Sequence, residues 1–288
     1  MVEKKTTNPF FKKIYSHKKT LFLLIPLLLL TIFFASILVK TPSNDRAWSP
    51  DQAILAHANI DEETITIYNV RNNTYRSTND YDVQHYNLTI NRSEIHSLYY
   101  MVEDLPDFPG FAHTLVSFGI NKDEYVAISV EIRREQEETY DPVKGLLREY
   151  ELMYVIADER DVINLRANYR NNTVMLYPVN ASQEVIEELL VSMLERTNKL
   201  KEEPEFYNTL TSTCTTNLVR AMNERTNTKI SALHPYVLLP QHSDKLLLNR
   251  GLIQTNLTSI KEVRDAHTIN EQARQHQYSQ EFSRAIRE

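Results

Sequence analysis

The run of residues 21–39 (LFLLIPLLLLTIFFASILV) constrains this chain more than any other feature. It contains nineteen residues without a charge. A helix of that length, at about 1.5 Å per residue, spans the roughly 30 Å hydrocarbon core of a membrane. Pro26 near its start is tolerated in a membrane helix. The sequence therefore predicts one N-terminal transmembrane helix, followed by about 250 residues that suffice for one domain with a full core.

The distribution of lysine predicts how the chain is oriented. Residues 1–20 carry six lysines, so the positive-inside rule makes them a cytoplasmic basic tail. Residues 21–39 then form a signal anchor, and 40–47 a linker to an extracytoplasmic domain over 48–262. A cleaved signal peptide is the alternative, but no small-x-small cleavage site follows the apolar run. The polar residues 263–288 are predicted to be a C-terminal tail.

The net charge of −6 is divided unevenly. Residues 1–40 carry seven lysines and one glutamate, so the remaining residues have a net charge of −12. An acidic domain without clustered Lys and Arg is a poor partner for nucleic acid. The four glycines form no phosphate-binding loop, and the nine His with one Cys show no metal-ligand spacing. We therefore predict no cofactor and no metal.

Hydrophobic periodicity predicts an α+β domain. Alternating patterns indicate strands over 64–70, 83–90, 113–120, 125–133, 149–156 and 173–179. Helical patterns and N-cap signals indicate helices over 50–58, 91–101 and 158–166, a longer one from 182, and one over 218–223. Strands 113–120 and 125–133 form a hairpin whose apolar residues pair even number with even number. That register places His113 opposite Glu131 or Arg133, depending on the turn length.

Cys214 is the single cysteine of the chain and lies in the segment 205–217. Thr211, Ser212 and Thr213 precede it, and such residues before an apolar helical run are N-cap candidates. In the first turn of a helix, the free N–H groups and the helix dipole stabilise a thiolate and lower the pKa of the thiol. A buried, inert core cysteine is the alternative.

His113 is the base that best matches this nucleophile. A histidine at a strand start with a carboxylate on the neighbouring strand is held in a useful orientation. No other nucleophile and base in the sequence suit a thiol enzyme outside the cytoplasm. The alternative is a solvated strand face, on which Ser129, Glu131 and Arg133 alternate outward.

Several longer motifs resemble the Lnb N-terminal periplasmic domain family over about residues 46–255. These motifs are His113-Thr-x-x-Ser-Phe, Ser129-x-Glu-x-Arg133, Leu146-x-Arg-x-Tyr-Glu-Leu-x-Tyr154, Asp158-Glu-Arg-Asp161, Pro204-Glu-Phe-Tyr-Asn-Thr-Leu-Thr-x-x-Cys-Thr-Thr-Asn217 and Leu238-Leu-Pro-x-x-Ser-Asp244. The resemblance implies a circularly permuted papain-like (NlpC-type) domain with an antiparallel sheet, in which the His strand precedes the Cys helix. It also implies a location in the bacterial inner membrane, with the catalytic domain in the periplasm.

The activity that the resemblance implies is N-acylation of bacterial lipoproteins, with a membrane phospholipid as the acyl donor. Cys214 would form a thioester, His113 would deprotonate the acceptor amine, and Glu131 would orient His113. Supporting or oxyanion roles would fall to Thr215, Tyr207, Asn217 and Arg133. The sequence departs from the family pattern at Thr213, where we expect Asn.

Two other functions fit the same residues. The first is an extracytoplasmic cysteine peptidase or amidase that acts on peptide or cell-wall substrates, since the same pair can activate water. The second is an envelope domain without enzymatic activity, in which Cys214 belongs to the core.

Overall fold

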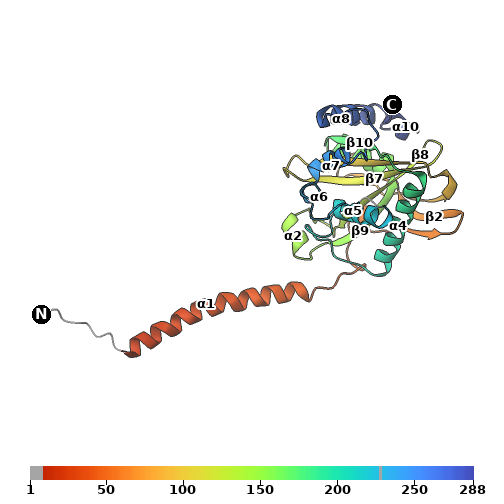
Figure 1. The fold of residues 1–288 in the computed structure, drawn as a ribbon. Helices are drawn as coiled ribbons and strands as arrows, with labels where there is room; N and C mark the ends of the chain where they lie inside the picture. Colours follow the sequence, from red (N-terminus) through yellow and green to blue (C-terminus); the bar gives the residue numbers. More distant parts are fainter. Residues whose placement is uncertain (1–8, 227–228) are drawn as a thin grey trace. The chain divides into compact units, whose positions relative to one another are not determined.

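A computed structural model describes residues 9–226 and 229–288 of the chain, which divides into two units, 1–41 and 42–288 (Figure 1). The first unit contains helix α1 (Pro9–Leu38), which includes nearly all of the predicted signal anchor. Among the residues that the structure describes, no helix combines the length and hydropathy needed to cross a membrane. The predicted cytoplasmic tail over 1–20 lies partly outside the described residues, which begin at residue 9.

The second unit is built on one mixed sheet. In the described part of this unit the strands follow the order β1-β2-β9-β8-β7-β6-β10, and β5 also pairs with β2. Only the short β2–β9 contact is parallel. The strands are β1 His57–Ile60, β2 Thr64–Arg71, β5 His85–Asn91, β6 Ser97–Asp104, β7 Ala112–Asn121, β8 Glu124–Arg133, β9 Glu151–Asp158 and β10 Val174–Pro178, with a separate β3–β4 pair at Thr74–Tyr75 and Tyr81–Asp82. The predicted α+β class is confirmed.

Helices cover both faces of this sheet. The longer α4 and α5 lie side by side over one face, where they share a core with the even-numbered apolar residues of β7 and β8 (Figure 1). The α3–η3 segment, α9 and α10 pack on the other face. The helices are α2 Pro142–Leu146, α3 Glu159–Asn164, α4 Gln183–Glu202, α5 Cys214–Arg225, α6 Pro235–Leu238, α7 Ser243–Asn249, α8 Ile260–His267, α9 Asn270–Gln275 and α10 Phe282–Ala285, with short 3-10 turns η1 Pro50–Gln52, η2 Arg92–Glu94 and η4 Pro240–His242, and a π-helix η3 Leu165–Tyr169.

The predicted β7–β8 hairpin and its register are confirmed. Val116 pairs with Ile128, and continuing this register places His113 opposite Glu131. The alternative of a solvated face is wrong, because Ser129 and Arg133 are buried. The α3–η3 segment, α9 and α10 cover the face that carries Ser129 and Arg133. The alternation of polar residues along one strand cannot show that helices will cover it.

Two predicted helices do not form, and each region contains one 3-10 turn that is followed by a strand. After the single turn η1, the region predicted as a helix over 50–58 extends into β1, which pairs with β2. The region 91–101 contains only the turn η2 and then β6, in which Leu98, Tyr100 and Val102 point into the core. Both segments gain ladder hydrogen bonds from distant strands, and this tertiary pairing outweighs the local N-cap signals.

The segment 263–288, predicted to be a polar tail, is part of the second unit. Phe282 is 2% exposed and lies in the core under the sheet. The guanidinium of Arg287 lies 3.4 Å from the ring centre of Tyr125 and forms an ion pair with the buried carboxylate of Glu159. Ile269, Ala273, Phe282 and Ile286 are spaced so that they pack on the sheet, although the overall composition of the segment is polar.

This packing predicts a stability difference between two aromatic residues of the segment. Phe282→Ala should lower the free energy of unfolding by about 3–5 kcal/mol, because it leaves a cavity in the core. Tyr278→Ala, at a side chain that is 76% exposed, should change it by less than about 0.5 kcal/mol. Urea unfolding of both variants measures the difference. Equal, small effects would mean that the segment does not pack on the sheet.

Candidate active site

Cys214 is the first residue of helix α5. Thr213 caps the helix: its hydroxyl accepts a hydrogen bond from the Thr216 N–H at 3.2 Å, and its own N–H donates to the Thr216 hydroxyl at 2.7 Å. This capping box fixes where the helix starts, so the thiol lies in the first turn, as the sequence predicts. Thr213 therefore supplies a complete cap at the position where the family pattern led us to expect Asn.

The thiol of Cys214 faces His113, the second residue of β7. Burial raises the pKa of the Cys214 thiol, but the charge and hydrogen bond of His113 outweigh it, and two hydrogen bonds from Thr114 add to the effect. The pKa of the thiol is lowered to about 7. Burial lowers the pKa of His113, yet the charges of Glu131 and Cys214 raise it to about 10. Between about pH 7 and pH 10 the two groups therefore form a thiolate–imidazolium pair.

The orientation of His113 is set by neighbours on β8. Its Nε2 lies 2.7 Å from the Ser129 hydroxyl and 3.2 Å from Glu131 Oε1, and Ser129 donates to the same Glu131 oxygen at 2.7 Å. Because Nε2 is occupied in this way, Nδ1 is the ring nitrogen available to the thiol. The Glu131 carboxylate therefore contacts the ring at Nε2 and leaves Nδ1 for the sulfur.

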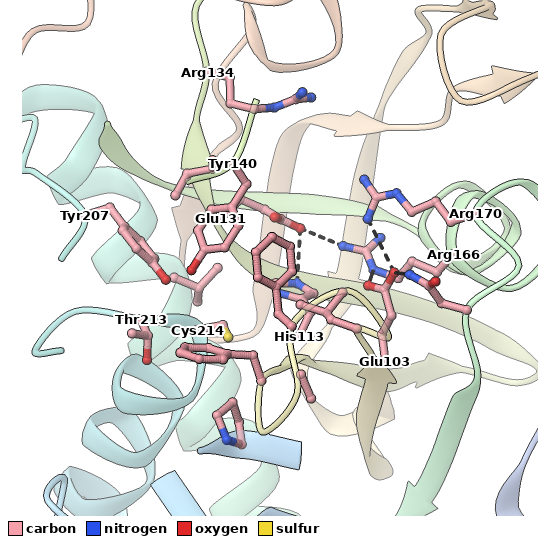
Figure 2. A pocket seen from close by; sticks show the side chains of 18 of the residues that line it. Glu103, His113, Glu131, Arg134, Tyr140, Arg166, Arg170, Tyr207, Thr213 and Cys214 are labelled. Carbon is pink, nitrogen blue, oxygen red and sulfur yellow. Dashed lines mark hydrogen bonds and ion pairs between the residues drawn. The ribbon is translucent and has the colours of Figure 1, made fainter. Parts of the chain in front are cut away.

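A buried arginine continues this arrangement. Arg166 Nη2 donates to Glu131 Oε1 at 2.6 Å, and its Nε lies 2.9 Å from Glu103 Oε2 (Figure 2). Burial raises the pKa of Glu131, but His113 and Arg166 hold that pKa well below its usual range. Arg166 belongs to the π-helix η3, a distortion that is frequent at functional sites. The carboxylate beside His113 is therefore kept ionised and fixed in position.

These residues open onto a cavity of about 320 Å³. Cys214, His113 and Glu131 line it, and Figure 2 shows them between Tyr207 and Thr213 on one side and Arg166 and Arg170 on the other. Part of the wall is apolar and aromatic, formed by Leu105, Phe108, Phe111, Tyr140, Tyr207 and Leu238. The lining also includes the guanidinium groups of Arg134 and Arg170, which pair with the carboxylates of Asp51 and Glu103. The cavity therefore offers a substrate both an apolar surface and charged groups.

The structure brings some of the predicted supporting residues to the site and leaves others away from it. Tyr207 lines the cavity, and the Thr215 hydroxyl lies 3.7 Å from the Cys214 sulfur. Asn217 instead bonds the Ser212 hydroxyl and the Thr213 carbonyl, which stabilises the turn before the helix. Arg133 bonds the carbonyls of Gln52 and Ala53 and stacks on Trp48, outside the residues that line the cavity.

Sequence reasoning missed Ser129, Arg166 and Glu103 as parts of the site. Ser129 and Glu103 lie on strands beside His113, where only the sheet order reveals their proximity. Arg166 carried a usable signal, since it lies in a segment whose neighbours Val162, Ile163 and Ala167 are apolar and buried. A charged residue within such a segment requires a buried partner.

The comparison with known families agrees with this geometry. The family model of the Lnb N-terminal periplasmic domain matches residues 81–249, more than half of the chain. The chain belongs to this family. Searches of curated proteins and of solved structures find no match. The Lnb domain match includes every residue of the Cys214–His113–Glu131 arrangement, and it indicates a domain of the cell envelope.

The pKa values predict how Cys214 of this Lnb domain reacts with iodoacetamide. Because the thiolate is the nucleophile, the alkylation rate should rise with pH with a midpoint near 7, instead of near the ordinary value of 9. In His113→Ala the midpoint should move above 9, since burial then acts without the opposing charge. Mass spectrometry follows the reaction without ambiguity, because the chain has one cysteine. Identical midpoints in both proteins would disprove the pairing.

Proposed function

We propose that this protein is a membrane-anchored thiol acyltransferase that N-acylates bacterial lipoproteins, with a phospholipid as the acyl donor. The observation that carries the proposal is the Cys214–His113 pair in a cavity with apolar and charged walls. Membership of the Lnb N-terminal periplasmic domain family supports the envelope setting. The order of elements, with the His strand before the Cys helix, supports the comparison with permuted papain-like enzymes.

In the first half-reaction, the Cys214 thiolate would attack the ester carbonyl of the donor. A sulfur–carbon bond forms, and as the ester carbon–oxygen bond breaks, the leaving alkoxide takes a proton from the His113 imidazolium. The products are a thioester on Cys214 and a lysophospholipid. The negative charge on the carbonyl oxygen would be stabilised by N–H groups in the first turn of α5.

In the second half-reaction, the amine of the acceptor would attack the thioester carbonyl. His113, now neutral, accepts a proton from the amine as the carbon–nitrogen bond forms and the carbon–sulfur bond breaks. Glu131 and Ser129 keep the imidazole ring in place through both steps. Arg166 is a positioning residue in this scheme, because it acts on His113 through Glu131.

The direct test is mass spectrometry of lipoprotein N-termini from cells that depend on this protein. We expect N-acylated lipoproteins with wild-type protein, and a loss of at least about 10³-fold with Cys214→Ala, which removes the nucleophile. His113→Ala should produce a similar loss. His96→Ala, at an exposed histidine outside the cavity, serves as the matched control and should retain the N-acyl product.

Incubation with purified lipoprotein and phospholipid distinguishes the remaining functions. Peptide cleavage without an N-acyl product would favour the cysteine peptidase or amidase. Unchanged N-acylation in Cys214→Ala would instead mean that the cysteine is a core residue and that another protein performs the transfer.

The proposal includes attachment to the cytoplasmic membrane through residues 21–39, on the basis of their nineteen uncharged residues. Large apolar side chains of α1, including Leu27, Leu28 and Leu29, are exposed, as a lipid-facing surface requires. The full-length protein should stay with membranes during alkaline carbonate extraction and be released by detergent. Replacing Leu28 and Leu29 with Lys should move it to the soluble fraction, since each charge near a membrane centre costs about 3 kcal/mol. Carbonate release of the unmodified protein would contradict the anchor.

A further inference from the structure

A second cavity, of about 270 Å³, runs along helix α5. The α5 residues that line it are Thr215, Leu218, Val219 and Met222, and Thr226 just after the helix lines it too. Their spacing of three and four residues is one face of the helix. From Thr215 to Met222 this face is about 10 Å long, at about 1.5 Å per residue. The cavity therefore borders about two turns of the helix.

The rest of the wall is almost entirely hydrocarbon. It comes from elements that surround α5, including Leu98 and Tyr100 of β6, Val116 of β7, Val185 and Leu189 of α4, and Leu246 of α7. No charged side chain is among the described residues that line the cavity. A surface of this kind favours apolar ligands, because binding removes hydrocarbon from water.

The few hydroxyl groups in the wall already have protein partners. Tyr100 donates to the Ser243 hydroxyl at 2.8 Å, and Ser243 donates to the Pro240 carbonyl at 2.6 Å. The Thr215 and Thr114 hydroxyls lie 3.0 Å apart and bond each other. A ligand therefore gains little from polar groups at this site, and a sugar, a nucleotide or a charged peptide would lose its hydration without replacement.

The cavity begins at the catalytic residue. Thr215 lines it, and the Thr215 hydroxyl lies 3.7 Å from the sulfur of Cys214, which lines the active-site cavity. The α6–η4 segment also lies between the two cavities. Leu238 lines the active-site cavity and Val237 lines the apolar cavity. The Thr114–Thr215 pair is thus the partition between the sulfur and the apolar cavity.

We infer that this cavity holds the hydrocarbon chain of the acyl group that is bonded to Cys214. The inference rests on the proposed acyl transfer and adds to it a binding site for a single long fatty acyl chain. To reach this cavity the chain must part the hydrogen-bonded Thr114–Thr215 pair, and it then lies along the apolar face of α5. Its carbonyl group remains at the sulfur, in the cavity where the amine arrives. Each buried methylene adds to the affinity, so the length of the cavity gives the enzyme a preference for long chains.

The test is the chain-length preference of acyl-enzyme formation. Full-length protein is mixed with p-nitrophenyl palmitate or p-nitrophenyl butyrate in detergent, and the rate of thioester formation on Cys214 is followed by intact mass spectrometry. Ala181→Trp places a large side chain at a small residue of the cavity wall. We expect it to lower the palmitate-to-butyrate rate ratio about tenfold, the equivalent of about two buried methylenes.

Ala266→Trp is the matched control, because Ala266 is exposed on α8 and does not line the cavity. It should leave the rate ratio within about twofold of the unmodified protein. Met222→Trp repeats the test from the opposite wall, and circular dichroism establishes that each variant is folded. A folded Ala181→Trp or Met222→Trp protein with an unchanged ratio would overturn the inference.

A binding measurement separates this inference from the proposed function. The fluorescent fatty acid cis-parinaric acid should bind to Cys214→Ala, which cannot turn over, and palmitate should displace it. Adding Ala181→Trp should weaken its affinity about tenfold. If no thioester forms on the unmodified protein but this binding pattern holds, acyl transfer is wrong and the lipid site stands. If thioesters form but parinarate binds both variants equally, the site is wrong and acyl transfer stands.

Discussion

A buried series of alternating charges, from Glu103 through Arg166 and Glu131 to His113, is the interaction on which the site depends. Each ion costs free energy to remove from water and is stabilised only because the next one lies within about 3 Å. Loss of any interior member leaves an unpaired buried charge, which typically costs 3–5 kcal/mol. The orientation of His113 therefore depends on residues from β6, η3, β8 and its own strand β7. The charge of Glu131 also raises the pKa of His113, which keeps the imidazole protonated beside the thiol.

The nucleophile is placed by a different kind of interaction. The capping box between Thr213 and Thr216 fixes the first turn of α5, and the helix then separates two cavities of opposite character. One has ionisable groups, whereas the other is lined by hydrocarbon. A single residue step, from Cys214 to Thr215, crosses between them. The proposed acyl transfer would use this division, because its substrate has a reactive polar group joined to a long apolar chain.

The second layer of helices explains why the charges near His113 are buried at all. A sheet with one solvated face would leave Ser129 and Glu131 in water, where screening weakens both their bond to His113 and its effect on the pKa of that ring. The α3–η3 segment supplies Arg166 to this face, and the C-terminal segment closes the sheet beside it through Phe282. Segments far apart in the chain, one before β10 and one at the end, thus contribute to the environment of the same face.

Local patterns in the sequence determined the α+β class, the β7–β8 hairpin with its even-to-even pairing, a helix with Cys214 near its start, and the choice of Cys214 and His113 as a candidate pair. Each of these depends on periodicity or capping within a few residues, together with one pairing of two adjacent strands. The tertiary structure alone decided that 50–58 and 91–101 extend into strands, that the polar C-terminal segment packs on the sheet, and that Arg166 and Glu103 reach the site while Arg133 and Asn217 do not. Those outcomes depend on contacts between residues that are distant in the chain, and the free energy of such contacts is set by burial and sheet order, which no local pattern encodes.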